Sequence, residues 1–124
     1  MPHQAKVLGD LAANNPANRV AIAAAGGIAG LVPLLSGTMG GGGVPIYTAA
    51  EEAALALGNL AANNDENRVV IGQAGGVASL IELLGEGTMR AKEEAAFALR
   101  NLTNGNDENA KEAFRLGYRR TQND

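Results

Sequence analysis

Two stretches of this chain are near copies of each other, and no other feature limits the fold so strongly. Residues 8–35 and 57–84 align at an offset of 49, and 18 of the 28 aligned pairs are identical. A third copy begins at residue 95 at an offset of 42, which sets the basic period. Periods of this length are typical of solenoids built from two- or three-helix units, in which each unit buries its apolar face only against its neighbours.

Capping signals divide each unit into short helices. Asn64 followed by Asp65 is typical of an N-cap and a first helical residue, and residues 15–16 (Asn-Pro) repeat the signal. A short first helix then ends at a Gly-Gly pair, at 26–27 or 75–76, because glycine adopts the left-handed cap conformation at little cost. We therefore expect a first helix after each Asn signal and a second helix after each Gly pair.

Apolar residues in the second and third helices recur at helical spacing, which predicts one buried stripe per helix. The longest helix is predicted to open at Thr48, with Glu51 at the spacing of a capping box. No segment shows a sustained period of two, so we expect no sheet, and the glycines at 37–43 predict a flexible extended loop. The predicted stripes are Ile28, Leu31, Val32 and Leu35; Val77, Leu80, Ile81 and Leu84; Ala53, Ala56, Leu57 and Leu60; and Ala95, Ala98, Leu99 and Leu102.

This order of three helices resembles the armadillo repeat. The motifs are NDENRVVIGQAGGVASLIELL followed by EEAAFALRNL, and the resemblance covers nearly all of residues 5–117. It implies an all-α, right-handed α-solenoid of three-helix repeats in one domain, 1–124. Its parts would be a partial repeat 1–14, a repeat 15–63 with a Gly-rich insertion at 39–47, a repeat 64–105, a partial repeat 106–117 and a tail 118–124.

The third helices carry side chains that the core stripes leave over. These residues cluster on a separate face through i+3 and i+4 spacings. Stacked repeats would align such faces into one strip along a concave surface. The strip consists of Glu93, Phe97, Arg100 and Asn101 in the last unit, Glu51, Leu55, Gly58 and Asn59 in the middle unit, and Pro2, Lys6, Gly9 and Asp10 in the first partial unit.

In the armadillo family this strip is a peptide groove, in which an Asn of the third helix hydrogen-bonds the main chain of an extended peptide. The resemblance assigns that role to Asn59 and Asn101, whereas Asp10 offers an acceptor only. The position four residues earlier, which is Trp in the peptide binders of the family, holds Lys6, Leu55 and Phe97. The alternative is that the asparagines bond carbonyls of their own neighbourhood and that Phe97 is a core residue.

Charge along the strip indicates a basic partner. The pairs 51–52 and 93–94 are all Glu, although carboxylates in a first helical turn also stabilise the helix dipole. Arg19 and Arg68 recur at one position of the first helix, where a surface or inter-repeat salt bridge is expected. The sequence thus predicts a non-catalytic protein-interaction module that binds an extended, basic peptide segment.

Composition excludes several classes of function and several kinds of partner. The chain has no Cys, and its single histidine, His3, offers one metal ligand at most, so we expect no metal, cofactor or disulfide. The stretch GTMGGGG lacks the G-K-[ST] of a phosphate-binding loop, and no group of residues forms a catalytic constellation. A net charge of −3 without basic runs argues against nucleic acid, and no apolar run is long enough for a membrane span. An intracellular location, cytoplasmic or nuclear, is expected.

Neither end of the array shows a polar capping repeat of the kind that solenoids need for solubility. The chain would then be part of a longer array, or it would cover its apolar ends by forming a homo-oligomer. Self-association is therefore the alternative function that the sequence predicts.

Overall fold

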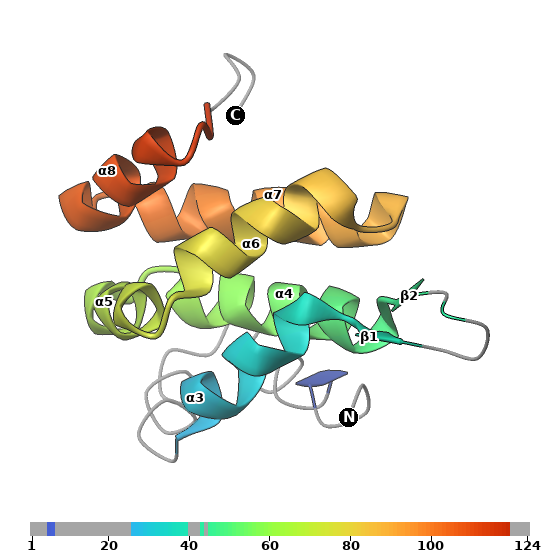
Figure 1. Ribbon diagram of the computed structural model, residues 1–124. Coiled ribbons are helices and arrows are strands. Elements are labelled where there is room, and N and C mark those ends of the chain that lie inside the picture. Colours follow the sequence, from blue (N-terminus) through green and yellow to red (C-terminus); the bar gives the residue numbers. More distant parts are fainter. Residues whose placement is uncertain (1–4, 7–25, 40–42, 44, 120–124) are drawn as a thin grey trace.

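Short helices stack into an elongated array in the computed structural model, which describes residues 5–6, 26–39, 43 and 45–119 (Figure 1). Helices α5, α6 and α7 follow one another as one unit, with α3, η1 and α4 on one side of it and α8 on the other. The predicted all-α solenoid is confirmed. The elements are α3 (Gly27–Leu31), the 3₁₀ helix η1 (Val32–Ser36), β1 (Thr38–Met39), β2 (Pro45–Ile46), α4 (Thr48–Ala61), α5 (Asp65–Gln73), α6 (Gly76–Glu86), α7 (Met89–Thr103) and α8 (Asp107–Arg115).

Asparagine caps begin the two first helices that the structure describes, α5 and α8; the predicted cap at Asn15 lies outside the described residues. The side chain of Asn64 accepts a hydrogen bond of 2.9 Å from the backbone N–H of Asn67, and Asn106 accepts one of 2.9 Å from Asn109. Each bond satisfies one of the N–H groups that a helix leaves open at its first turn. Helix α5 ends before Gly75, which has φ 86°, so the left-handed stop is also confirmed.

The predicted capping box at the start of α4 is wrong. Tyr47, not Thr48, occupies the N-cap position, and it makes no side-chain capping bond. The carboxylate of Glu51 instead accepts a hydrogen bond of 2.5 Å from the hydroxyl of Thr88, which itself caps α7 through the N–H of Ala91. Because Thr88 belongs to the next unit, spacing within one unit could not reveal this partner.

The second helix of the first unit is shorter than its sequence pattern predicts. It is α-helical only over Gly27–Leu31 and continues as the tighter 3₁₀ helix Val32–Ser36. Pro33 explains the change, because proline has no N–H to donate and its ring clashes with the carbonyl four residues earlier. The copy in the next unit has Glu82 at this position, and α6 remains α-helical to Glu86.

A small antiparallel sheet replaces part of the predicted loop. Thr38 pairs with Ile46 and Met39 with Pro45, so the expectation of no sheet is wrong for these residues. Strands of two residues are too short to produce a visible alternation of polar and apolar residues. At Gly37, which has φ 74°, a side chain would be strained and its Cβ would lie 3.0 Å from Cε1 of Tyr47.

Small residues dominate the core where α4 packs against α7. Alanines on the two helices are fully buried, and short side chains let the helix backbones approach closely. The α6 stripe differs from its prediction, because Leu83 is buried whereas Ile81 and Leu84 are only partly buried. Side-chain exposure is zero at all eight predicted stripe positions of α4 and α7: Ala53, Ala56, Leu57, Leu60, Ala95, Ala98, Leu99 and Leu102.

Two buried asparagines that the sequence analysis missed join the helices of successive units. The side-chain amide of Asn67 donates to the carbonyl of Leu60 at 2.9 Å. The amide of Asn109 donates to the carbonyls of Leu102 at 3.0 Å and Arg68 at 2.9 Å. Both amides thus satisfy carbonyls in the last turn of a third helix, where intrahelical donors run out. The recurrence of Asn at this position in every copy was the available signal.

Candidate functional site

The face of α7 that the sequence assigns to a binding groove contacts α4 at Gly58. A Cβ atom built on Gly58 would lie 2.4 Å from Cε2 and 2.5 Å from Cδ2 of Phe97, so the ring rests directly on the glycine. One turn further along α7, the amide of Asn101 donates to the carbonyl of Gly58 at 2.9 Å. Phe97 and Asn101 therefore both meet the same residue of the neighbouring unit, and the two predicted site residues lie together.

One of the two N–H groups of the Asn101 side-chain amide has a structural role. One N–H holds the carbonyl of α4, which is the local role that the sequence left open. An amide carries a second N–H and an acceptor oxygen, so this bond does not use its whole capacity. Asn59 is half-buried at the matching position of α4 and has an interaction partner. Asp10, at the third matching position, lies outside the described residues.

The other predicted groove residues differ in exposure. Leu55, Phe97 and Arg100 are half-buried, whereas Glu93 is exposed. Arg100 has an interaction partner of its own. We call the groove face the set Glu51, Leu55, Asn59, Glu93, Phe97, Arg100 and Asn101. Lys6 is exposed, and Pro2 and Gly9 lie outside the described residues.

A charge cluster lies at the N-terminal ends of α4 and α7. The guanidinium of Arg90 contacts Glu52 at 2.6 Å, Glu51 at 3.7 Å and Glu94 at 3.8 Å. Glu52 is only 7% exposed, and its second carboxylate oxygen has no hydrogen-bond partner among the described residues. Three carboxylates against one guanidinium leave this end of the groove face negative. Sequence analysis predicted the acidity but not the buried ion pair.

The surroundings of two ionisable groups in this cluster shift their pKa values. The pKa of the Glu94 carboxyl is raised, chiefly because burial disfavours its charge; the carboxylates of Glu52, Glu93 and Glu51 add to the rise, and Arg90 opposes it. The hydrogen bond to Glu52 is the main reason that the pKa of Arg90 is raised above its ordinary value. Arg90 therefore stays charged, whereas the Glu94 carboxyl takes up a proton at higher pH than an ordinary glutamate does.

The predicted salt bridge at Arg68 is present and lies within α5. Its guanidinium contacts the carboxylate of Asp65 at 2.5 Å, while the side chain is only 8% exposed. The Nε–H of Arg68 is buried without a hydrogen-bond partner among the described residues. Arg19, the matching residue of the first unit, lies outside them.

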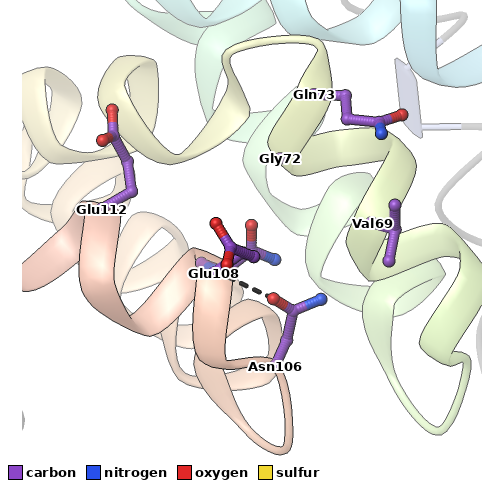
Figure 2. A pocket seen from close by; sticks show the side chains of 7 residues that line it. Val69, Gly72, Gln73, Asn106, Glu108 and Glu112 are labelled. Atoms are coloured by element: carbon purple, nitrogen blue, oxygen red, sulfur yellow. Dashed lines mark hydrogen bonds between the residues drawn. The ribbon is translucent and has the colours of Figure 1, made fainter.

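A pocket of about 330 Å³ lies between the first helices α5 and α8, away from α4. Figure 2 shows Val69 and Gln73 on one helix, with Glu108 and Glu112 on the other. This pocket was not predicted from the sequence, because it forms between two units from residues 33 or more positions apart.

Metal-binding groups and membrane-spanning helices are two further features that bear on function. No group of three His, Cys, Asp or Glu side chains that could hold a metal ion occurs among the described residues. No single described helix is long and apolar enough to cross a membrane. Helices α5 and α6 reach that length and composition only when taken together, and they bend by 76° at their junction.

Comparison with known proteins supports the resemblance. Residues 64–104 match the family described as the Armadillo/beta-catenin-like repeat. An engineered protein of known crystal structure is 35% identical, with a TM-score of 0.83 over 94% of this chain and 44% of that chain. ARO, an armadillo repeats only protein from Plasmodium falciparum, is 25% identical, with a TM-score of 0.78 over 94% of this chain and 46% of that one.

A designed armadillo repeat protein, solved in complex with the peptide (KR)4, is also similar. It is 25% identical, with a TM-score of 0.78 over 91% of this chain and 44% of that chain. This chain spans less than half the length of each of these three structures. No curated protein matches the chain by sequence.

These findings confirm the predicted resemblance. The chain carries an armadillo repeat and has the fold of armadillo-repeat solenoids. That fold is commonly a protein-binding scaffold and is typically non-catalytic.

We predict that Gly58→Ala destabilises the protein by about 1 kcal/mol or more, because its methyl would overlap the Phe97 ring. In a Phe97→Ala background the same change should cost much less, because only the Cα of Ala98, at 3.3 Å, then opposes the added Cβ and alanine favours helix over glycine. Urea unfolding of the four proteins gives the coupling energy. The control is Gly85→Ala in α6, where no atom lies within 4 Å of the added Cβ and no loss is expected. Equal effects of Gly58→Ala in both backgrounds would contradict the contact.

We also predict that Glu94→Gln raises the thermal midpoint at neutral pH. The raised pKa of Glu94 means that the folded state takes up this proton more readily than the unfolded chain. Its contribution to stability is therefore greatest below the unfolded pKa, about 4.3, and falls as pH rises through the folded value. The advantage of the variant should disappear in acid. The exposed Glu82→Gln on α6 serves as the control, and a Glu94→Gln protein that is less stable at pH 7 would contradict the prediction.

Proposed function

We propose that this chain is a non-catalytic interaction module that binds an extended, basic peptide segment of a partner protein along the groove face. The observation that carries the proposal is the half-buried ring of Phe97. The ring rests on Gly58, so it is held in place while part of its surface remains open to a ligand. A fixed aromatic surface contributes contact area at little cost in conformational entropy.

Charge supports a basic ligand. Exposed Glu93 stands one turn from Phe97 on α7, and the cluster around Arg90 is negative at the same end of the helix. Carboxylates so placed attract cations and raise the rate of encounter with a basic segment. The similar designed armadillo protein was solved with a peptide of alternating Lys and Arg.

The amides of the groove face support an extended peptide. Asn101 retains an N–H and an oxygen beyond its bond to Gly58, which suits a peptide backbone that alternates donors and acceptors. We propose the same role for Asn59 one unit earlier, with Asp10 as an acceptor-only position. Leu55 and Arg100 would flank the peptide. An intracellular location, cytoplasmic or nuclear, stays a prediction from the sequence.

The proposal predicts that fluorescently labelled (KR)4 binds the chain, with an affinity that falls as salt rises. Phe97→Ala should weaken binding about tenfold or more, as expected for an anchoring aromatic residue. Glu93→Gln should weaken it less and reduce the salt dependence. Fluorescence anisotropy provides the measurement.

Glu82→Gln on α6 makes the same change in net charge away from the groove face and should leave binding unchanged. A glycine–serine peptide of equal length should not bind. Equal losses in Glu82→Gln and Glu93→Gln would mean that net charge alone attracts the peptide. Unchanged binding by Phe97→Ala would contradict peptide binding at the groove face.

Self-association is a second candidate function, favoured by the outer face of α8. Phe114 is 62% exposed and Leu116 is 36% exposed, and a hollow beside Phe114 is lined by Ala110 and Tyr118. Exposed apolar patches of this kind commonly mark interaction sites. Only the guanidinium of Arg119 covers the Phe114 ring, at 3.7 Å from its centroid, among the described residues.

If this face mediates assembly, sedimentation should detect a dimer or larger species at micromolar concentration. Phe114→Glu should restore the monomer, because it places a charge in the apolar contact. Val69→Glu replaces an exposed apolar residue of α5 and should leave the oligomer intact. A wild-type protein that sediments as a monomer would contradict this function.

A further inference from the structure

The pocket between α5 and α8 belongs to the first helices of two units, and no residue of the groove face lines it. Its volume of about 330 Å³ is at the lower end of ligand-binding pockets, enough for one long side chain. Val69, which is 45% exposed, and Gly72 form part of the α5 wall, while Glu108, Asn109 and Glu112 belong to the α8 wall.

The amide of Asn109 is fixed in one orientation inside this pocket. Its nitrogen donates to the carbonyls of Arg68 and Leu102, so both of its N–H groups are used. The oxygen must therefore face the other way, toward Gly72, where an added Cβ would lie 2.1 Å from it. Asn109 is only 5% exposed, and its oxygen accepts no hydrogen bond in the part of the chain that the structure describes.

An amide oxygen that has no protein donor can accept a hydrogen bond from a donor that enters the pocket. The carboxylates of Glu108 and Glu112 add two more acceptors, and none of the lining residues is basic. Arg115 donates three hydrogen bonds of 2.8, 3.0 and 3.1 Å to the two carboxylate oxygens of Glu112, and solvent screens this exposed i,i+3 pair. A cation from a partner could therefore displace it.

We propose that this pocket binds the side chain of a lysine on a partner polypeptide. A lysine ammonium has three donors and no acceptor, which matches the oxygen of Asn109 and the carboxylates of Glu108 and Glu112. The four-carbon stem of lysine would lie along Val69 and Gly72 while the charged end reaches the acceptors. The site is separate from the groove face and does not depend on the proposed function.

The residues that line this pocket are not all repeated at the preceding interface between units. At the matching positions of the preceding units, Ala23 replaces Gly72 and Val70 replaces Glu112, while Glu66 matches Glu108. The preceding interface thus lacks both the glycine that admits the amide and one of the two carboxylates. A lysine should accordingly bind once per chain rather than once per unit.

The test uses a short capped glycine–serine peptide with one central lysine, titrated into the ¹⁵N-labelled chain. Saturable shifts of the backbone amides of Gly72, Gln73 and Glu112 are expected. The same peptide with acetyl-lysine, which lacks the charge, should not produce them. Glu108→Gln combined with Glu112→Gln should weaken binding at least about fivefold, since both charged acceptors for the ammonium become neutral.

Glu82→Gln combined with Glu86→Gln changes net charge equally on α6 and should leave the shifts intact. Phe97→Ala should also leave them intact, which separates this site from the groove face. Shifts confined to α4 and α7, or equal shifts with acetyl-lysine, would overturn the proposal. Thermal unfolding of each variant establishes that the fold is retained, and Glu112→Val, which copies the preceding interface, provides a second variant with the same expected loss.

Discussion

The close contact between α4 and α7 is the constraint on which the rest of this structure depends. A solenoid has no central core, so each unit is stable only against its neighbours. Here the neighbours meet through alanines with no exposed surface, such as Ala53 and Ala98. Short side chains bring the two backbones near enough for Phe97 to rest on Gly58 and for Asn101 to reach its carbonyl. The groove face is therefore a product of the same packing that holds the units together.

Side-chain amides complete this packing where helix backbones end. Asn67 and Asn109 are almost fully buried, and each donates to a carbonyl in the last turn of the preceding third helix. Asn109 also reaches Arg68 in the preceding first helix, so one side chain connects three helices. Buried amides of this kind specify how far a unit rotates against the next, because a different rotation would leave carbonyls without donors.

The two proposed binding surfaces use different parts of this frame. The groove face lies on third helices and presents a held aromatic ring with acidic neighbours. The pocket lies between first helices and presents an amide oxygen with two carboxylates. Both favour basic ligands, as the net charge of −3 would suggest, but through separate residues. A basic partner that engaged both would gain from their linkage without any new contact.

The sequence by itself determined most of the helix boundaries and the buried stripes of α4 and α7. Period, Asn caps and Gly stops are local signals, and they correctly placed α5, its left-handed end and the core of α7. Tertiary structure alone decided what the polar side chains between units bond to. Glu51 bonds Thr88 rather than its own helix, and Asn101 holds Gly58, because these partners lie 37 and 43 residues away. The spacing of apolar residues indicates which side of a helix is buried, because it depends on the helix alone. A hydrogen bond between units depends on how the neighbouring unit packs.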